Sequence, residues 1–298
     1  MPQPFLAVLL GFLDFVGAGL VALSLIEGPG PLLGLATIPQ SFRRDEKRPR
    51  VPPRAPAEPR QTRLIVAPRK LSPTGLRFES IDKRYGGLFA LRRVTFEISP
   101  GECAVLAGRN GSGKTTLLRI AGQIVRPTAG KLSFPGSTAD SGGNSRPGYV
   151  GHSTMVYDEL TAEENLLLFA RLQKVESPVA RAEDLLREVG LYERRASLVR
   201  TFSRGMRQRI AIARALIHRP SVLLLDEPAT GLDPLGITWL ANSLRELNQA
   251  GCTIVMSLHG ESEISSLATR AVRLDAGNVI ADTKTGASLH DILTFGAA

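Results

Sequence analysis

The stretch from 102 to 121 reads ECAVLAGRNGSGKTTLLRIA and carries the strongest structural signal in the chain. An apolar run typical of a buried strand leads into a glycine-rich turn, and the turn leads into residues compatible with a helix. The turn, Gly108 to Thr115, fits the pattern GxxxxGK[ST], which needs this context of strand, turn and helix. A glycine-rich structural turn without a ligand is the competing interpretation. We interpret the stretch as a phosphate-binding loop in an α/β protein.

The residue types of this loop suit the binding of a nucleotide and a metal ion. Glycines let the backbone turn tightly, so that successive N–H groups and the N-terminus of the new helix point at one anion. Lys114 would hold the β- and γ-phosphates, and the hydroxyl of Thr115 would bind Mg²⁺. The predicted nucleotide-binding residues of the loop are Gly108, Arg109, Asn110, Gly111, Ser112, Gly113, Lys114, Thr115 and Thr116.

A second motif, SVLLLDE at 221–227, is an apolar strand that ends in two carboxylates. In a phosphate-binding α/β sheet, ligands collect at the C-terminal ends of the strands, so these acids would face the same site. Asp226 suits the coordination sphere of Mg²⁺, directly or through water, and Glu227 would polarise an attacking water as a general base. Alone, this run is more often a strand that ends in a solvated acidic turn. Combined with the loop, it predicts a hydrolytic site.

Two further residues gain meaning only beside these motifs. Tyr85 precedes Lys114 by 29 residues, at a position where its ring would stack on adenine. His259 follows the apolar run at 253–257 and would donate a hydrogen bond to the γ-phosphate. By themselves, such a tyrosine is an ordinary surface or core residue and such a histidine is usually structural.

The wider pattern of apolar runs predicts the fold. Alternating runs over 76–98 indicate an opening antiparallel sheet, and the strands expected at 222–226 and 253–257 alternate with helical stretches, as in a parallel sheet. We expect an α/β fold, a P-loop core with an N-terminal antiparallel sheet and a helical subdomain inserted at about 151–217. The helices expected in that subdomain span residues 161–172, 178–189 and 204–217.

Residues 1–40 are a hydrophobic segment. Within it, residues 5–26 are apolar except for Asp14 and are long enough to span a bilayer. Basic residues follow this run and none precedes it, so the positive-inside rule would leave the rest of the chain in the cytoplasm. One interpretation is a single N-terminal membrane anchor. The other is an upstream extension without defined structure, from a misassigned start codon. A cleaved signal peptide fits less well, because the start lacks a basic region.

Charge separates the next segment from the folded region. Residues 41–75 are rich in Pro and Arg, which predicts an extended linker beside a membrane or a solvated tail. Ten Lys or Arg against three Asp or Glu lie within 41–70, so this segment holds seven of the nine net positive charges of the 298-residue chain. The nearly neutral remainder argues against nucleic acid as a partner. The composition, 43% hydrophobic and 22% charged residues, excludes a wholly disordered chain. Because the sequence pattern changes at Leu76, we expect one domain over 76–298.

The two cysteines indicate the redox compartment. Cys103 and Cys252 are too few for a disulfide framework, and both lie in apolar runs that predict buried strands. The folded part is therefore expected in a reducing, cytosolic setting.

From about Leu76 to Ile280, the chain resembles the ATP-binding cassette of ABC transporters. The phosphate loop and the SVLLLDE strand carry part of the resemblance, and the segment FSRGM at 202–206, followed by RQRIAIARALIHRP, carries the most distinctive part. FSRGM is similar to the signature motif of the family, with Phe, Arg and Met where Leu, Gly and Gln are usual. The tripeptide GLD at 231–233 is similar to the D-loop, and His259 stands at the place of the switch histidine.

The resemblance implies the activity and the partners. ATP would be hydrolysed with Mg²⁺, and Ser203, Gly205 and Asp233 would join the nucleotide site. In the family, the signature serine contacts the γ-phosphate of the opposite subunit. Ser203 opens a helix of the inserted region, far from its own phosphate loop, so that helix N-terminus needs the nucleotide of a second chain. The resemblance implies a homodimer with separate transmembrane permease subunits, at the cytoplasmic face of the cell membrane, peripheral or held by one N-terminal anchor.

A narrower resemblance concerns the segment YVGHSTMVYDELTAEEN at 149–165. Most cassettes have a glutamine in this loop, whereas this chain has His152 after a glycine. This segment and FSRGMRQR are similar to the ATP-binding subunit of the haem exporter used in cytochrome c maturation. The resemblance implies that His152 links the nucleotide to the permease, so we expect catalytic roles for Glu227, His259 and His152. We expect haem export, and another bacterial ABC exporter is the alternative.

Two other functions compete with transport. A soluble ABC protein acting on DNA or ribosomes typically has two cassettes in one chain or long coiled-coil insertions, and neither is evident here. A non-hydrolysing, nucleotide-gated regulator would not need both Glu227 and His259. Transport therefore remains the favoured function, while the sequence identifies neither the cargo nor the membrane partner.

Overall fold

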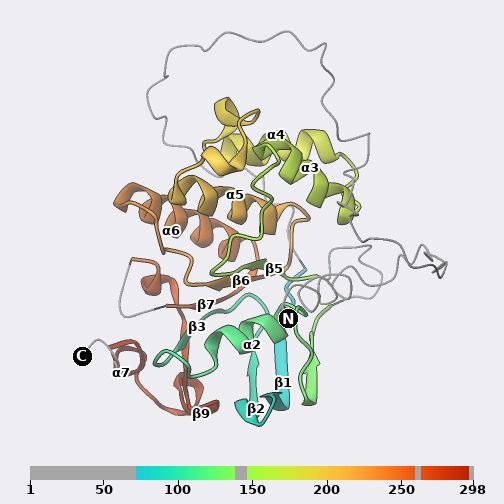
Figure 1. Ribbon diagram of the computed structural model, residues 1–298. Helices are drawn as coiled ribbons and strands as arrows, with labels where there is room; N and C mark the ends of the chain where they lie inside the picture. Colours follow the sequence, from blue (N-terminus) through green and yellow to red (C-terminus); the bar gives the residue numbers. More distant parts are fainter. Residues whose placement is uncertain (1–71, 138–145, 259–262, 295–298) are drawn as a thin grey trace, which may run out of the picture.

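The computed structural model describes residues 72–137, 146–258 and 263–294 (Figure 1). The hydrophobic segment 1–40, most of the linker 41–75 and the predicted switch residue His259 lie outside the described residues. Within the described ranges, none of the helices combines the length and the apolar composition that a bilayer crossing needs.

An antiparallel sheet opens the described chain, as the alternating runs predict. The order of its strands is β2-β1-β4. The apolar side chains of β1 alternate into the interior, where Phe78 stacks on Phe96 with the ring centroids 4.7 Å apart. The strands of this sheet are β1 (Leu76–Tyr85), β2 (Leu88–Ile98) and β4 (Ala129–Ser133).

The core sheet has six strands in the order β5-β6-β7-β3-β8-β9. Its first five strands pair in parallel, and β9 is antiparallel to β8. The central strands are buried along their full length, which explains their unbroken apolar sequences. The strands are β3 (Cys103–Ala107), β5 (Gly148–Val150), β6 (Val222–Asp226), β7 (Thr253–Ser257), β8 (Arg270–Asp275) and β9 (Asn278–Asp282).

The helices cover both faces of the core sheet. Helices α3, α4 and α5 lie between β5 and β6 in the chain, with no strand among them, and begin and end within one residue of the predicted ranges. A capping box between Thr161 and Glu164 starts α3. The helices are α2 (Lys114–Ala121), α3 (Ala162–Leu172), α4 (Pro178–Glu188), α5 (Arg204–Leu216), α6 (Pro234–Gln249) and α7 (Leu289–Thr294), with 3₁₀ turns at Tyr192–Arg194, Val199–Thr201, Ser265–Leu267 and Thr283–Thr285.

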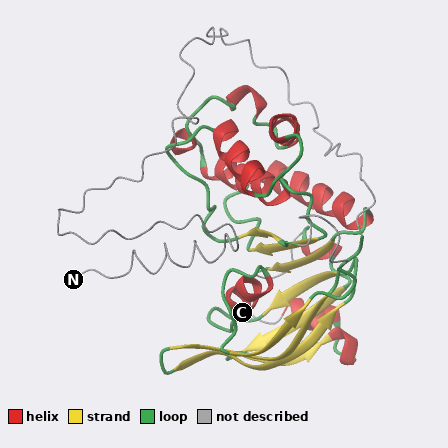
Figure 2. Ribbon diagram, turned by 90° about the vertical axis from the view of Figure 1, so that its right-hand side faces the viewer, coloured by secondary structure: helices red, strands yellow, loops and turns green. Residues whose placement is uncertain are grey.

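Two apolar clusters fill the two sides of the core sheet. Alternate residues of β3 contribute to each, because successive side chains of a strand point to opposite faces. One cluster joins the sheet to α2 and the antiparallel sheet, and the other joins it to α5, α6 and the helical subdomain. The arrangement of these helices around the sheet can be followed in Figures 1 and 2. Helices α2 and α5 therefore lie on opposite faces of the core sheet.

The cysteines are buried as their apolar surroundings predict. Cys103 begins β3, and Cys252 directly precedes β7. Both are free thiols, 1% and 0% exposed, and burial raises the pKa of each to about 12.

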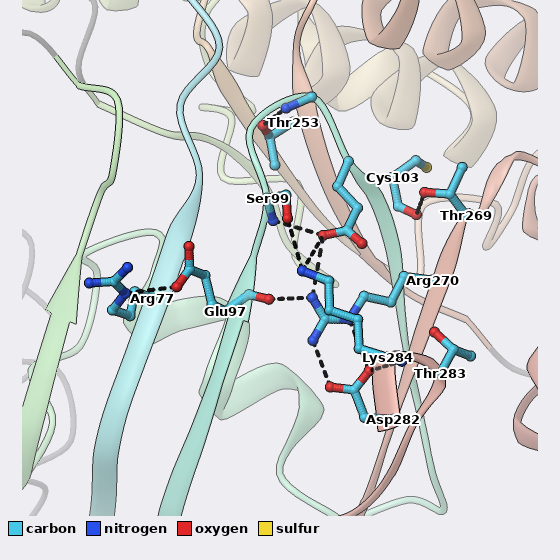
Figure 3. A network of polar contacts seen from close by, with 12 residues as sticks. Arg77, Glu97, Ser99, Cys103, Thr253, Thr269, Arg270, Asp282, Thr283 and Lys284 are labelled. Atoms are coloured by element: carbon cyan, nitrogen blue, oxygen red, sulfur yellow. Dashed lines mark hydrogen bonds and ion pairs between the residues drawn. The ribbon is translucent and has the colours of Figure 1, made fainter. Parts of the chain in front are cut away.

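A cluster of paired charges closes the core sheet at the N-terminal end of β3 (Figure 3). Arg270 is 2% exposed and donates two hydrogen bonds to the carboxylate of Asp282, at 3.0 and 2.6 Å. Its remaining terminal nitrogen donates to Oε2 of Glu102, at 3.3 Å, and to the carbonyl oxygen of Glu97. The cluster ties β2, β3, β8 and β9 together.

Candidate functional site

The phosphate loop joins β3 to α2 at the C-terminal edge of the core sheet. Gly113 precedes α2 with φ at 108°, in the left-handed region that favours glycine. At Gly108, φ is 138°, and a Cβ atom would lie 2.2 Å from the carbonyl oxygen of Leu274. The glycines of the motif are therefore required by close packing of the loop against neighbouring main chain.

Lys114 folds its ammonium group back onto this loop. Its Nζ atom donates to the carbonyl oxygens of Gly108, at 2.6 Å, and Arg109, at 3.0 Å. Burial lowers the pKa of Lys114, while the negative charges of Glu227 and Asp226 act in the opposite direction. A buried ammonium group beside two acids is thus part of the loop.

The carboxylate of Asp226 lies beside the first turn of α2. Its Oδ1 atom accepts hydrogen bonds from Thr115 Oγ1, at 3.2 Å, and from Ser257 Oγ, at 2.7 Å. Its Oδ2 atom is buried and has no hydrogen-bond partner among the described residues, and the same holds for Ser112 Oγ. An unpartnered buried polar group costs about 1–3 kcal/mol, and two such atoms next to a buried ammonium group suit a site that takes up a polar ligand.

The oxygen donors of this cluster fit Mg²⁺. Thr115 and Asp226 supply a hydroxyl and a carboxylate oxygen, the ligands that this ion prefers. The described residues contain no group of three or more His, Cys, Asp or Glu side chains able to hold a metal ion. Mg²⁺ usually keeps water and substrate phosphates among its ligands, so two protein oxygens beside a phosphate loop match its requirements.

Glu227 adopts an unusual backbone conformation directly after β6. Its φ is 52°, a left-handed value that costs a non-glycine residue about 1–3 kcal/mol. Its N–H group donates to both oxygens of Ser257, Oγ at 3.0 Å and the carbonyl at 3.2 Å. The neighbouring strand therefore holds the predicted general base in a strained conformation, as is frequent in functional sites.

Ser257 is the residue that the sequence analysis missed. It ends β7 and pairs in register with Asp226, so that one hydroxyl bonds both the acid and the following amide. The available signal was a polar residue that ends an apolar strand. Its meaning depends on β6 and β7 being neighbours, which the periodicity of the sequence does not reveal.

The other predicted residues of the phosphate loop surround Lys114. Arg109, Asn110 and Gly111 are exposed, and Thr116 lies half-buried on the first turn of α2. Arg109 also lines a small pocket, and its other lining residues are Arg273, Leu274 and Asp275.

Tyr85 ends β1 at the turn into β2 and is 50% exposed, with the ammonium group of Lys83 5.0 Å from its ring centroid. Strand β2 itself lies against the loop, because a Cβ atom on Gly113 would meet the side chain of Leu91 at 2.7 Å. The hairpin that carries Tyr85 therefore borders the phosphate loop.

The remaining predicted residues lie on other elements. Ser203 is exposed and caps α5, accepting a hydrogen bond from the amide of Met206 at 3.3 Å. Since α2 and α5 cover opposite faces of the sheet, one chain does not bring Ser203 and Gly205 to its own Lys114. His152 is exposed in the loop after β5. Asp233 caps α6, its carboxylate accepting from the amide of Gly236 at 2.8 Å.

Comparison with known proteins gives a consistent result. The family described as ABC transporter matches residues 91–230. The daunorubicin resistance ATP-binding protein DrrA3 of Streptomyces coeruleorubidus is 36% identical over 217 residues, which cover 71% of this chain and 69% of the relative. The linearmycin resistance ATP-binding protein LnrL of Bacillus subtilis is 34% identical over 218 residues, which cover 70% of each protein.

Among solved structures, the dimeric, post-hydrolysis state of the ATP-binding cassette MJ0796, bound to ADP and Pi, is similar. The TM-score is 0.62 at 28% identity, and the match covers 70% of this chain and 97% of that one. This likeness supports the fold class described above.

Proposed function

The chain belongs to the ATP-binding proteins of ABC transporters, as the ATPase subunit of a bacterial exporter, and on this premise we propose which residues perform its chemistry and what it exports. The observation that carries the residue assignment is the meeting of Lys114, Asp226 and Glu227 at one edge of the core sheet. The carboxylate of Asp226 accepts hydrogen bonds from the hydroxyl groups of both Ser257 and Thr115.

The catalytic roles follow from this arrangement. Lys114 would exchange the carbonyls of Gly108 and Arg109 for oxygens of the β- and γ-phosphates. Thr115 and Asp226 would hold Mg²⁺, which when bound neutralises negative charge on the phosphate oxygens. Glu227 would take the proton of the attacking water, as the water oxygen bonds to the γ-phosphorus and the bond to the ADP oxygen breaks.

We propose that two copies of the chain form the working ATPase. Ser203 and Gly205 lie at the start of α5, on the face of the sheet opposite α2, and Ser203 is exposed. The N-terminus of a helix attracts phosphate, so this end would meet the nucleotide of the second copy. The dimeric form of the similar cassette MJ0796 supports this arrangement. Tyr85 against adenine, and Asp233 and His259 beside the nucleotide, complete the proposed site.

The proposed cargo is a small-molecule compound of the antibiotic class. Both relatives reported above are named for drug resistance, and this supports export of such compounds better than the narrower expectation of haem export. Separate permease subunits would carry the cargo, and the exposed His152 would contact them. The exposed loop after β5 is consistent with that contact.

The ATPase assignment is tested with the full chain. Glu227→Gln removes the proposed base but keeps the size of the side chain, so ATP binding is expected to persist while hydrolysis falls at least a hundredfold. Glu193→Gln, a change of the same charge at an exposed turn, is the matched control and should hydrolyse ATP normally. Wild-type turnover by Glu227→Gln would show that another group activates the water.

The cargo is tested with the permease encoded by neighbouring genes. Co-expression of wild-type chain and permease in a drug-sensitive bacterium is expected to raise resistance to an exported compound, and co-expression with Lys114→Ala is not. Restored cytochrome c maturation in a strain lacking its haem exporter, without any gain in drug resistance, would instead support haem export.

A further inference from the structure

A buried amide connects the helix that begins at Ser203 with the loop that carries Glu227. Gln208 lies on the second turn of α5 and is 6% exposed. Its Nε2 atom donates to the carbonyl oxygen of Pro228, at 3.0 Å, and Pro228 directly follows Glu227. A buried amide group needs such a partner, so this contact fixes the distance between the helix and the loop.

A second contact joins the same two elements. The first turn of α5 packs against Gly231, because a Cβ atom built on Gly231 would lie 2.5 Å from Cδ of Arg204. A Cβ atom on Gly205 would lie 3.3 Å from the carbonyl oxygen of Gly231. The loop from Glu227 to Gly231 therefore lies against α5 at two places.

Glu227 is thus held from two sides. Ser257, on β7, accepts a hydrogen bond from the N–H group of Glu227, and Gln208, on α5, donates one to the carbonyl oxygen of Pro228. Because the left-handed φ of Glu227 is unfavourable, the conformation persists only while the neighbouring contacts maintain it. Loss of the Gln208 contact would let this segment relax and move the carboxylate.

We propose that Gln208 is a positioning residue for Glu227. Through this contact, Gln208 couples the binding of Ser203 to the nucleotide of the second copy to hydrolysis of the nucleotide held by its own chain. The inference rests on the proposed function, in which Ser203 contacts the nucleotide held by the second copy. A shift of α5 when its N-terminus meets that nucleotide is passed through Gln208 to Pro228 and Glu227 of the same chain. Each chain then hydrolyses its own ATP efficiently only when its α5 is engaged.

Steady-state kinetics of the full chain test the positioning role. Gln208→Met keeps the length of the side chain and removes the donor. We expect kcat to fall about tenfold and the KM for ATP to change less than about twofold, because the phosphate loop is untouched. Gln208→Leu, which also lacks the donor, provides a second variant should Gln208→Met fold poorly.

Asn248 supplies a matched control. Its Nδ2 atom also donates to main-chain carbonyls, those of Gly101 and Cys252, at 2.8 and 3.0 Å, but at the other end of the core sheet. Asn248→Leu is expected to lower the unfolding midpoint as Gln208→Met does and to leave kcat unchanged. Equal losses of kcat in both variants would mean that Gln208 is merely structural and would overturn the proposal.

A double-mutant cycle tests the coupling. In a Ser203→Ala background, the tenfold effect of Gln208→Met is expected to shrink to less than about threefold, because the signal from α5 is already lost. Additive effects would overturn the coupling role. Loss of hydrolysis in Glu227→Gln together with a wild-type kcat in both Gln208 variants would overturn this inference alone. Wild-type hydrolysis by Glu227→Gln would overturn the proposed function and the inference with it.

Discussion

The two ends of β3 carry buried polar clusters that differ in how fully their atoms are paired. At the N-terminal end, the guanidinium group of Arg270 donates to Asp282, Glu102 and a main-chain carbonyl. At the C-terminal end, Asp226 Oδ2 and Ser112 Oγ are buried without a partner among the described residues. The first cluster pairs its own charges, whereas the second keeps two buried polar atoms that no described residue satisfies.

This difference separates stability from function. A buried ion pair contributes structure only if its hydrogen bonds are complete, because otherwise desolvation outweighs the attraction. A site that must bind a ligand has to keep some of its polar atoms available, and it is less stable for that reason. Substitutions at the Arg270 end should therefore change the free energy of unfolding, and those at the phosphate loop should change ATP turnover.

The largest effect is expected for Arg270→Met. Removing Arg270 leaves the carboxylate of Asp282 without its guanidinium partner and should lower the free energy of unfolding by about 3–5 kcal/mol. Chemical unfolding measures this loss, and ATP turnover per folded molecule should be preserved. Arg77→Met breaks the exposed pair with Glu97, 47% and 41% exposed, and is the control, with an expected loss below about 1 kcal/mol. Similar losses in the two variants would show that the buried cluster contributes no more stability than the exposed pair.

Lys114→Ala should show the opposite behaviour. The hydrogen bonds of its ammonium group fold back on the loop, and its proposed role is to hold phosphate oxygens. We expect ATP turnover to fall about a hundredfold, equivalent to about 2.7 kcal/mol, with weaker nucleotide binding. The free energy of unfolding without nucleotide should stay within about 1 kcal/mol of wild type, since a partly desolvated charge is removed. A large loss of stability would show that Lys114 is needed for folding and not only for ATP turnover.

Two serine variants at the loop end should change stability in opposite directions. Ser112→Ala removes a buried hydroxyl without a partner and should raise the free energy of unfolding by about 1 kcal/mol. Ser257→Ala removes a hydroxyl bonded to both Asp226 and Glu227 and should lower it by about 1–2 kcal/mol. Thermal unfolding of the chain without nucleotide measures both, and changes of the same sign would refute this account of unpaired atoms.

The smallest expected effect is the loss of stability at acidic pH that comes from Asp282. Burial would raise the pKa of Asp282, but its hydrogen bonds to Arg270 and the amide of Lys284 lower it below the ordinary value of 3.8. A lowered pKa stabilises the folded state above the ordinary pKa, and this contribution is lost as the pH falls through the lower, folded value. The stability difference between wild type and Asp282→Asn should be constant above about pH 5 and shrink below about pH 4. Unfolding titrations at a series of pH values measure it, and a difference that grows on acidification would contradict the sign.

Local patterns predicted much of this fold. Strands at 222–226 and 253–257 have the predicted bounds, because a buried parallel strand is an unbroken apolar run. The helices of the subdomain differ by one residue at most, since their apolar faces and caps are local signals. The phosphate loop was predicted from its own motif, because the positive φ values of Gly108 and Gly113 are local, although both glycines also pack against main chain that is distant in sequence.

Contacts between distant residues escaped prediction. β5 has only three residues, too few for a periodicity, and is defined by pairing with β6. β4 and β9 likewise depend on partners elsewhere in the chain. The bonds of Ser257 and Gln208 to the region of Asp226 and Glu227 require strand order and helix packing that no local pattern contains. The cargo is not encoded in the ATP-site motifs, because one fold with one kind of ATP site serves many transported compounds.

Alkylation of the two buried thiols, Cys103 and Cys252, can report on the opening of the core sheet. Thiolate is the form that reacts with alkylating reagents, and a pKa of about 12 leaves almost none of it at neutral pH. Cys103 opens β3 at the Arg270 end, and Cys252 directly precedes the adjacent strand β7. Neither sulfur can be labelled unless this part of the sheet opens. The rate of alkylation therefore times the opening of one end of β3, without a spectroscopic probe or an engineered residue, while ATP turnover follows the other end independently.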